Sequence, residues 1–188
     1  MATSQAIRDT GETLRALLVA GVGPSVPTVN VEVTTSDAFS SLQSPQQPAI
    51  TIFLHRVAVH PEMRNGPPRR LPDGTLTRPL LPLELSFMIT PWARSTSDEH
   101  LLAGLVLQTL YDGAELGAAE LQGASWESGD SVQIVFESLS SEEHYRVWDT
   151  VGLPYRLSLT YLVRVVGIEP RERRFVAPVA EVLIGGPV

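Results

Sequence analysis

Apolar residues along the first sixty positions follow a helical period and then an extended one. The segment 3–20 repeats them at helical spacing, and glycines and a proline at 21–24 end the predicted helix. Strands are predicted at 29–34 and at Ala49–Val59, separated by a loop at 36–47 that is rich in Ser, Pro and Gln. Both faces of the second strand begin apolar, which indicates a central position in a sheet.

The middle of the chain predicts one strand and one long helix. Residues 81–90 alternate apolar and polar side chains, a period of two that is typical of a strand with one face on the core. A helix follows to about Asp112, with Ser95 among its candidate N-caps. Its apolar residues occupy nearly every side, so we expect more than one face to be covered, by its own sheet and by another chain.

The last third predicts a strand, a short helix and a strand. A weak helical turn and a loop lead to the strand at 132–139, and Ser140 with Glu143 forms a capping-box pattern at the start of the short helix. Gly152 closes that helix, and residues 156–166 alternate as the last clear strand. The whole pattern predicts an α+β fold, in which a mainly antiparallel sheet is packed by an N-terminal helix, a long central helix and a short third helix.

The proline-rich segment 61–79 is predicted to be a long loop. Loops of this length without secondary structure are uncommon, and are usually functional or disordered. Two interpretations are open: a surface insertion, or an arm that reaches a neighbouring subunit. In the second case the interface candidates are its arginines, Arg64, Arg69, Arg70 and Arg78.

We interpret residues 1–168 as one domain and 169–188 as a C-terminal arm. The arm opens with a charged cluster and continues with apolar residues, so it is either an edge strand on the chain's own sheet or a segment that adds a strand to a partner. Its interface candidates are Arg171, Arg173, Arg174, Phe175 and Ile184. On the polar face of the last strand Arg156 is a further candidate, whereas Trp148 and Tyr161 are expected in the core.

Composition and charge exclude several classes of protein. Of the 188 residues 43% are apolar, which is enough for a core, and no apolar run approaches the ~18 residues of a membrane span. The net charge of -7 disfavours nucleic acid as a partner. Charges lie inside the apolar N-terminal stretch rather than before it, so we expect no signal peptide and synthesis in the cytoplasm. All 14 basic residues are arginine, which suits interface contacts but equally fits GC-rich codon usage.

Candidate chemistry is sparse. Cysteine is absent, which removes disulfides, thiolate nucleophiles and Cys-based zinc sites. His55 and His60 are five residues apart on one strand and point to opposite faces, while His100 and His144 follow carboxylates that do not face them on a helix. No Gly-x-Ser-x-Gly elbow occurs. We therefore predict no catalytic residues, no cofactor, no metal and no enzymatic activity.

Four stretches, in this order and spacing, resemble one family. They are PAITIFLHRV at 48–57 followed by Arg64-Asn65, RPLLPLELSFMIT at 78–90, DEHLLAG at 98–104 with Leu110, and YRVW at 145–148 with PYRLSLTY at 154–161 and Arg164-Val165. Across about residues 14–169 the chain is similar to the cap, or tube-terminator, proteins of phage-tail-like contractile injection systems, of the virulence-cassette and antifeeding-prophage type. His55 stands where the family often has Tyr, and Leu105 where it often has a bulkier residue; neither departure changes the expected fold.

The resemblance implies a fold like that of phage tail terminators and a hexameric ring of identical copies. Its implied partners are the inner tube protein and the sheath protein, since a cap ends the growth of the tube and anchors the distal sheath ring. The implied location is the cytoplasm, within a particle that can be released. Two alternatives stay open: a tail terminator of a phage or of another contractile machine, and a cytosolic α+β ligand-binding domain or enzyme. The last would need a pocket that gathers His55, His100 or His144 with a carboxylate.

Overall fold

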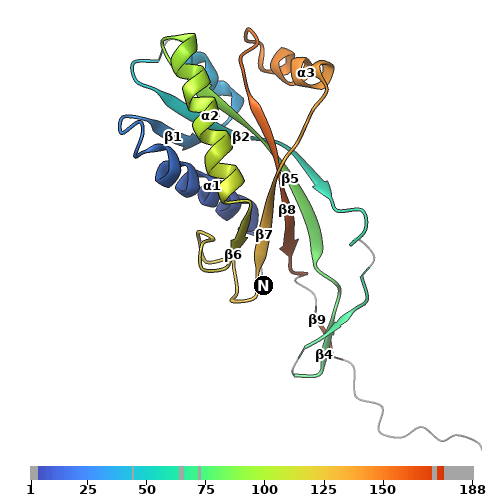
Figure 1. Ribbon diagram of the computed structural model, residues 1–188. Coiled ribbons are helices and arrows are strands. Elements are labelled where there is room, and N and C mark those ends of the chain that lie inside the picture. The colour runs from blue at the N-terminus through green and yellow to red at the C-terminus, as the bar shows by residue number, and fades with distance from the viewer. Residues whose placement is uncertain (1–3, 44, 64–65, 72, 171–172, 176–188) are drawn as a thin grey trace, which may run out of the picture.

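The computed structural model describes residues 4–43, 45–63, 66–71, 73–170 and 173–175 (Figure 1). The helices are α1 (Ala6–Val22), the 3-10 helix η1 (Ser36–Leu42), α2 (Thr96–Asp112) and α3 (Ser141–Val151). The strands are β1 (Asn30–Val33), β2 (Ala49–Val59), β3 (Arg69–Arg70), β4 (Thr75–Thr77), β5 (Leu81–Trp92), β6 (Glu115–Gly117), β7 (Ser131–Phe136), β8 (Leu159–Ile168) and β9 (Arg173–Phe175). The predicted α+β class, with a mainly antiparallel sheet, is confirmed.

A curled six-stranded sheet forms the body, in the order β1-β2-β5-β8-β7-β6. Neighbouring strands are antiparallel, except that β1 runs parallel to β2. The central strand β5 is buried on both faces from Leu85 to Trp92. The expectation that one face of this strand is polar and outside the core was therefore wrong, because a second layer covers the Met88 face.

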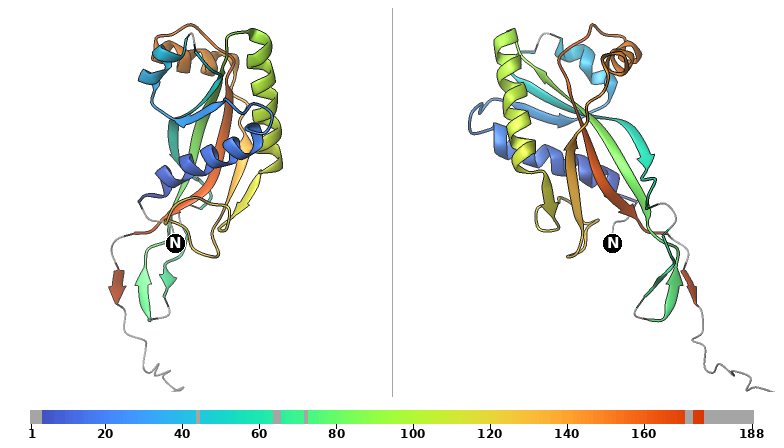
Figure 2. Two further views of the ribbon diagram at one scale, coloured as in Figure 1. Left: turned by 90° about the vertical axis from the view of Figure 1, so that its left-hand side faces the viewer. Right: turned by 45° about the vertical axis from the view of Figure 1, so that its right-hand side comes forward.

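The helices α1 and α2 pack side by side on the first face of the sheet (Figure 2). Their contribution to the larger core comes from apolar residues at helical spacing: Leu14, Leu18, Val22, Leu102, Val106 and Leu110. The two helices approach closely at Gly21, where a methyl group would lie 2.4 Å from the Thr109 side chain. A larger residue at position 21 would push α1 and α2 apart.

On the second face, η1 and α3 enclose a small aromatic core at one end of the sheet. The rings of Phe39, Trp92 and Trp148 have centroids 5.4–6.2 Å apart, and all three side chains are buried. The indole N–H of Trp92 donates to the Thr51 hydroxyl at 2.9 Å, which satisfies a buried donor. The predicted core positions of Trp148 and Tyr161 are confirmed, with exposures of 1% and 3%.

Helix ends follow the local sequence signals. The Ser95 hydroxyl accepts from the backbone N–H of Asp98, and Gly113 is the C-cap of α2. Ser140 and Glu143 form the complete capping box, and Gly152 ends α3 with a positive φ of 73°. None of the helices in the described residues has the length and apolar character that a bilayer crossing requires.

Three local predictions were wrong. The segment 36–47, expected as a loop, contains η1, whose Phe39 is held by the aromatic core. The weak helical turn after Gly113 is instead β6, because it finds a partner in β7. The last long strand begins at Leu159 rather than at Arg156, since residues 154–158 lead out of α3 before pairing starts.

Residues 61–79 are not a structureless loop. Strands β3 and β4 form a hairpin, and β9 from the C-terminal segment pairs with β4 to complete a three-stranded sheet. Its turn uses Gly74 at φ 82°, and the Asp73 carboxylate accepts from the backbone N–H of Thr75 at 2.9 Å. Figures 1 and 2 show this sheet projecting well away from the body; we call it the β-arm (β3, β4 and β9).

Candidate functional site

The β-arm brings together two segments that are a hundred residues apart in the sequence. Thr77 of β4 is paired with Arg69 of β3 on one side and with Arg173 of β9 on the other. In the next cross-strand row, Leu76 is paired with Arg70 and Arg174. Four of the predicted arginine candidates, two from the loop and two from the tail, thus lie on the strands of one element.

The structure describes some of the predicted interface candidates completely, others only by their backbone, and others not at all. Arg70 and Arg78 are exposed. Arg69, Arg173, Arg174 and Phe175 are placed by their backbone strands. Arg64, Arg171 and Ile184 lie outside the described residues. For residues 173–175 the pairing partner is β4 of the same chain.

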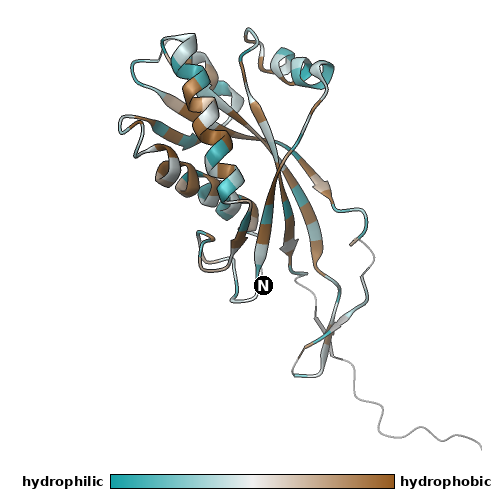
Figure 3. Ribbon diagram, in the orientation of Figure 1, coloured by the Kyte–Doolittle hydropathy of each residue, from teal (hydrophilic) through white to brown (hydrophobic). Residues whose placement is uncertain are grey.

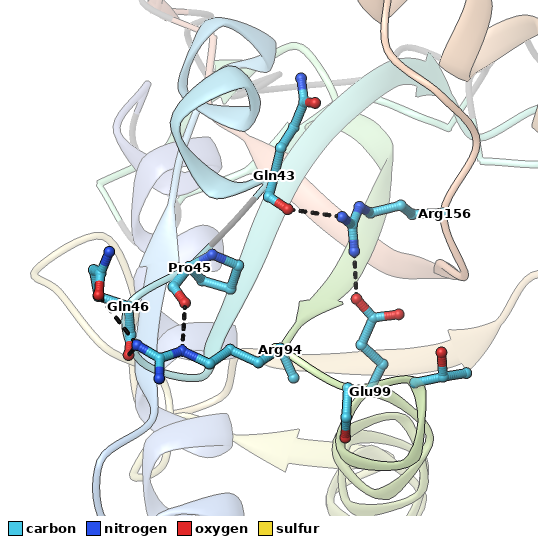
Figure 4. A pocket seen from close by; sticks show the side chains of 9 residues that line it. Gln43, Pro45, Gln46, Arg94, Glu99 and Arg156 are labelled. Atoms are coloured by element: carbon cyan, nitrogen blue, oxygen red, sulfur yellow. Dashed lines mark hydrogen bonds and ion pairs between the residues drawn. The ribbon is translucent and has the colours of Figure 1, made fainter.

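Arg156 lies beside the start of α2, where it lines a cavity (Figure 4). Its guanidinium forms an ion pair with the Glu99 carboxylate, donates to the carbonyl of Gln43 at 3.0 Å and stacks 5.0 Å from the centre of the Trp92 ring. These contacts join three elements of one chain. That Arg156 contacts another subunit stays a prediction. The contacts that the structure shows stabilise the fold of one chain.

A second arginine shares the same cavity, which has a volume of about 440 Å³. Arg94 follows β5 and donates to the carbonyls of Pro45 and Gln46 at 3.4 and 3.0 Å, and to the Gln46 side chain at 3.1 Å (Figure 4). Sequence reasoning missed Arg94 because its partners lie about fifty positions earlier. Both arginines fasten the connection between η1 and β2 to the body.

The outer side of α2 carries exposed apolar residues, as expected for a helix with apolar residues on nearly every side. Leu101 and Tyr111 are 55% and 82% exposed, and Leu107 lies between them along the helix. Figure 3 shows apolar positions along the length of α2, including the side turned away from the sheet. Near Tyr111, Phe136 of β7 is also exposed and borders an apolar hollow of about 380 Å³. Leu107, Tyr111 and Phe136 thus lie around one pocket, and an exposed apolar cluster of this kind is typical of a protein-interaction surface.

The enzyme alternative depended on a pocket that gathers a histidine with a carboxylate. His100 and Glu99 line one cavity of about 350 Å³, but Arg156 already occupies the Glu99 carboxylate. Burial lowers the pKa of His55 and of His144, which favours their neutral forms. Among the described residues, no three His, Asp or Glu side chains are grouped so that they could hold a metal ion.

Comparison with known proteins gives one family and one fold. Residues 9–181 match the model of the Pvc16 N-terminal domain. The chain is similar to the sheath/tube terminator of an extracellular contractile injection system, PVC, in its extended state, with a TM-score of 0.68 and 21% identity. It is also similar to the tube-terminating cap of the anti-feeding prophage, AFP, with a TM-score of 0.65 and 18% identity.

The matches cover nearly all of this chain but a smaller share of each solved chain. The alignments cover 100% and 94% of this chain, but only 65% and 60% of the two solved chains. This chain therefore spans somewhat less than two thirds of their length. No curated protein sequence matched it.

Proposed function

This chain belongs to the Pvc16 N-terminal domain family, and we propose that it is a structural cap that ends the inner tube of a contractile injection particle. The family match over residues 9–181 is the observation that carries the proposal. The fold supports it, because two solved proteins with this fold are a sheath/tube terminator and a tube-terminating cap.

The proposed partners are further copies of the chain, the inner tube protein and the sheath protein. A terminator needs one surface that matches the end of the tube and another that no further tube subunit can bind. A closed ring, which we take to be hexameric, also needs a head-to-tail contact between unlike surfaces of neighbouring copies. The chain offers two unlike surfaces of the kind that this role requires: the exposed apolar cluster of Leu107, Tyr111 and Phe136, and the β-arm.

The proposal gives the chain no catalytic activity and no cofactor. Its work would be done by surface complementarity, with assembly in the cytoplasm before the particle is released. The alternative of a terminator from a phage tail or another contractile machine uses the same surfaces. Neighbouring genes for a sheath, a tube and an AAA-type ATPase would favour the injection particle.

Deletion of the gene from a particle-producing strain tests the function directly. We expect electron micrographs to show tubes of uncontrolled length, with sheaths that have lost their distal end. Re-expression of the full chain should restore a single length, which controls for effects on neighbouring genes. Tubes of normal length in the deletion strain would refute the proposal.

Assembly of the purified chain gives a second test. Mass photometry should show rings of identical copies, either alone or after addition of purified tube protein. Monomers under both conditions would contradict the ring.

A further inference from the structure

We propose that the β-arm of one copy docks into a groove between the C-terminal halves of α1 and α2 on the next copy. This contact would supply the head-to-tail interface of the ring, so the inference rests on the proposed function. The occupant of the groove is a second copy of this chain.

Charge is divided sharply between the two surfaces. The three strands of the β-arm hold four arginines and no carboxylate, a formal charge of +4. The whole chain carries -7, so the remainder carries -11. No arginine occurs between Arg94 and Arg146, a stretch that includes all of α2, β6 and β7. A basic projection on an acidic body is complementary to another copy of the same body.

The groove has an apolar floor and an acidic rim. It has a volume of about 500 Å³, with Leu17, Leu105 and Leu116 on its floor and the carboxylates of Asp112 and Glu120 beside them. In the described part of the chain, neither carboxylate has an arginine partner within ion-pair distance, although Glu120 accepts from the backbone N–H of Gly117. Such a groove suits a segment that carries both arginine and apolar residues, and the β-arm has the exposed Arg70 paired with Leu76 on the neighbouring strand.

The two surfaces cannot meet within one molecule. Figures 1 and 2 show the β-arm projecting past one end of the sheet, beyond β5 and β8, whereas α1 and α2 lie toward the opposite edge of the body. Complementary patches that point away from each other are the arrangement of a heterologous contact, in which each copy gives one surface and receives the other.

Charge reversal tests the pairing. An arm variant carries Arg70→Glu in β3 and Arg78→Glu directly after β4. A groove variant carries Asp112→Arg and Glu120→Arg, and a third protein combines all four changes. Each of the first two should weaken ring formation at least tenfold in mass photometry, and the combination should recover it. The matched control is Glu142→Arg with Asp149→Arg on exposed positions of α3, which alters net charge as much as the groove variant and should leave the rings intact.

Cross-linking covers the case in which a reversed variant fails to fold. Because the chain has no cysteine, an Arg70→Cys protein and a Glu120→Cys protein can be mixed and oxidised, and any mixed disulfide then joins two copies. We expect a covalent dimer in the mixture and little in either protein alone. Intact wild-type rings with no mixed dimer would overturn the arm-in-groove contact and leave the cap function standing. The arm-in-groove contact would also be overturned if the Glu120→Cys protein formed a disulfide with a cysteine-bearing tube protein instead of with the Arg70→Cys protein.

Discussion

Replacement of the buried Asp9 by alanine should destabilise the fold. Asp9 is 2% exposed on α1, and its carboxylate accepts from the Ser125 hydroxyl at 2.5 Å and from the Arg8 guanidinium at 2.9 Å. Nearby, the Thr13 hydroxyl accepts from the backbone N–H of Gln122 at 2.9 Å. These bonds hold the connection between β6 and β7 against α1.

The expected loss can be worked from these contacts. A hydrogen bond to a buried charged group contributes about 1.5–3 kcal/mol, and Asp9 accepts such a bond from the buried Ser125 hydroxyl. Arg8 is largely exposed, so its ion pair adds at most about 1 kcal/mol. We expect Asp9→Ala to lower the free energy of unfolding by about 3 kcal/mol, or the Tm by roughly 6–12 °C for a chain of this size.

The effect of Asp9 should depend on pH. Burial opposes ionisation, but the hydrogen bonds from Ser125 and Arg8 outweigh it, and the pKa of Asp9 lies below its usual value of 3.8. A carboxyl with a lower pKa in the folded state stabilises fully above its unfolded pKa, and loses that contribution as pH falls through the folded pKa. The stability difference between the native protein and Asp9→Asn should therefore be constant near neutral pH and shrink below pH 3.8.

Urea unfolding followed by circular dichroism measures these differences. A double-mutant cycle with Ser125→Ala isolates the Asp9–Ser125 bond, for which we expect a coupling above about 1 kcal/mol. A coupling below about 0.5 kcal/mol, or a loss from Asp9→Ala under about 1 kcal/mol, would refute the reasoning.

Two further substitutions test the fold. Gly123→Ala should cost at least about 1 kcal/mol from its φ of 93°, and more because the new methyl would lie 2.3 Å from the Asp9 carboxyl carbon; an unchanged Tm would contradict this. Trp148→Ala should lower the free energy of unfolding by about 3–5 kcal/mol, because it empties the aromatic core between η1 and α3. A loss below about 1 kcal/mol in chemical denaturation would show that this cluster contributes little.

The candidate site was visible in the sequence only in parts. Arginines at 69–78 and at 171–174 were recognised as two separate sets, because each stands out locally by charge. Their union in the β-arm depends on the pairing of β4 with β9, across about a hundred residues, and no short-range pattern encodes that partner. The acidic groove was missed for the same reason, since Leu17 and Glu120 come from distant parts of the chain.

By itself, the sequence determined the elements whose causes are local. The period of apolar residues, the Ser95 cap and the Ser140–Glu143 capping box act within a few positions of the backbone they shape, so α1, α2, α3 and the long strands β2 and β5 were predictable. Tertiary structure alone decided the short strands of the β-arm, the second buried face of β5 and the contacts of Arg156. Each of these depends on which distant segment comes to lie opposite, and the free energy that fixes it is gained only when both segments are in place.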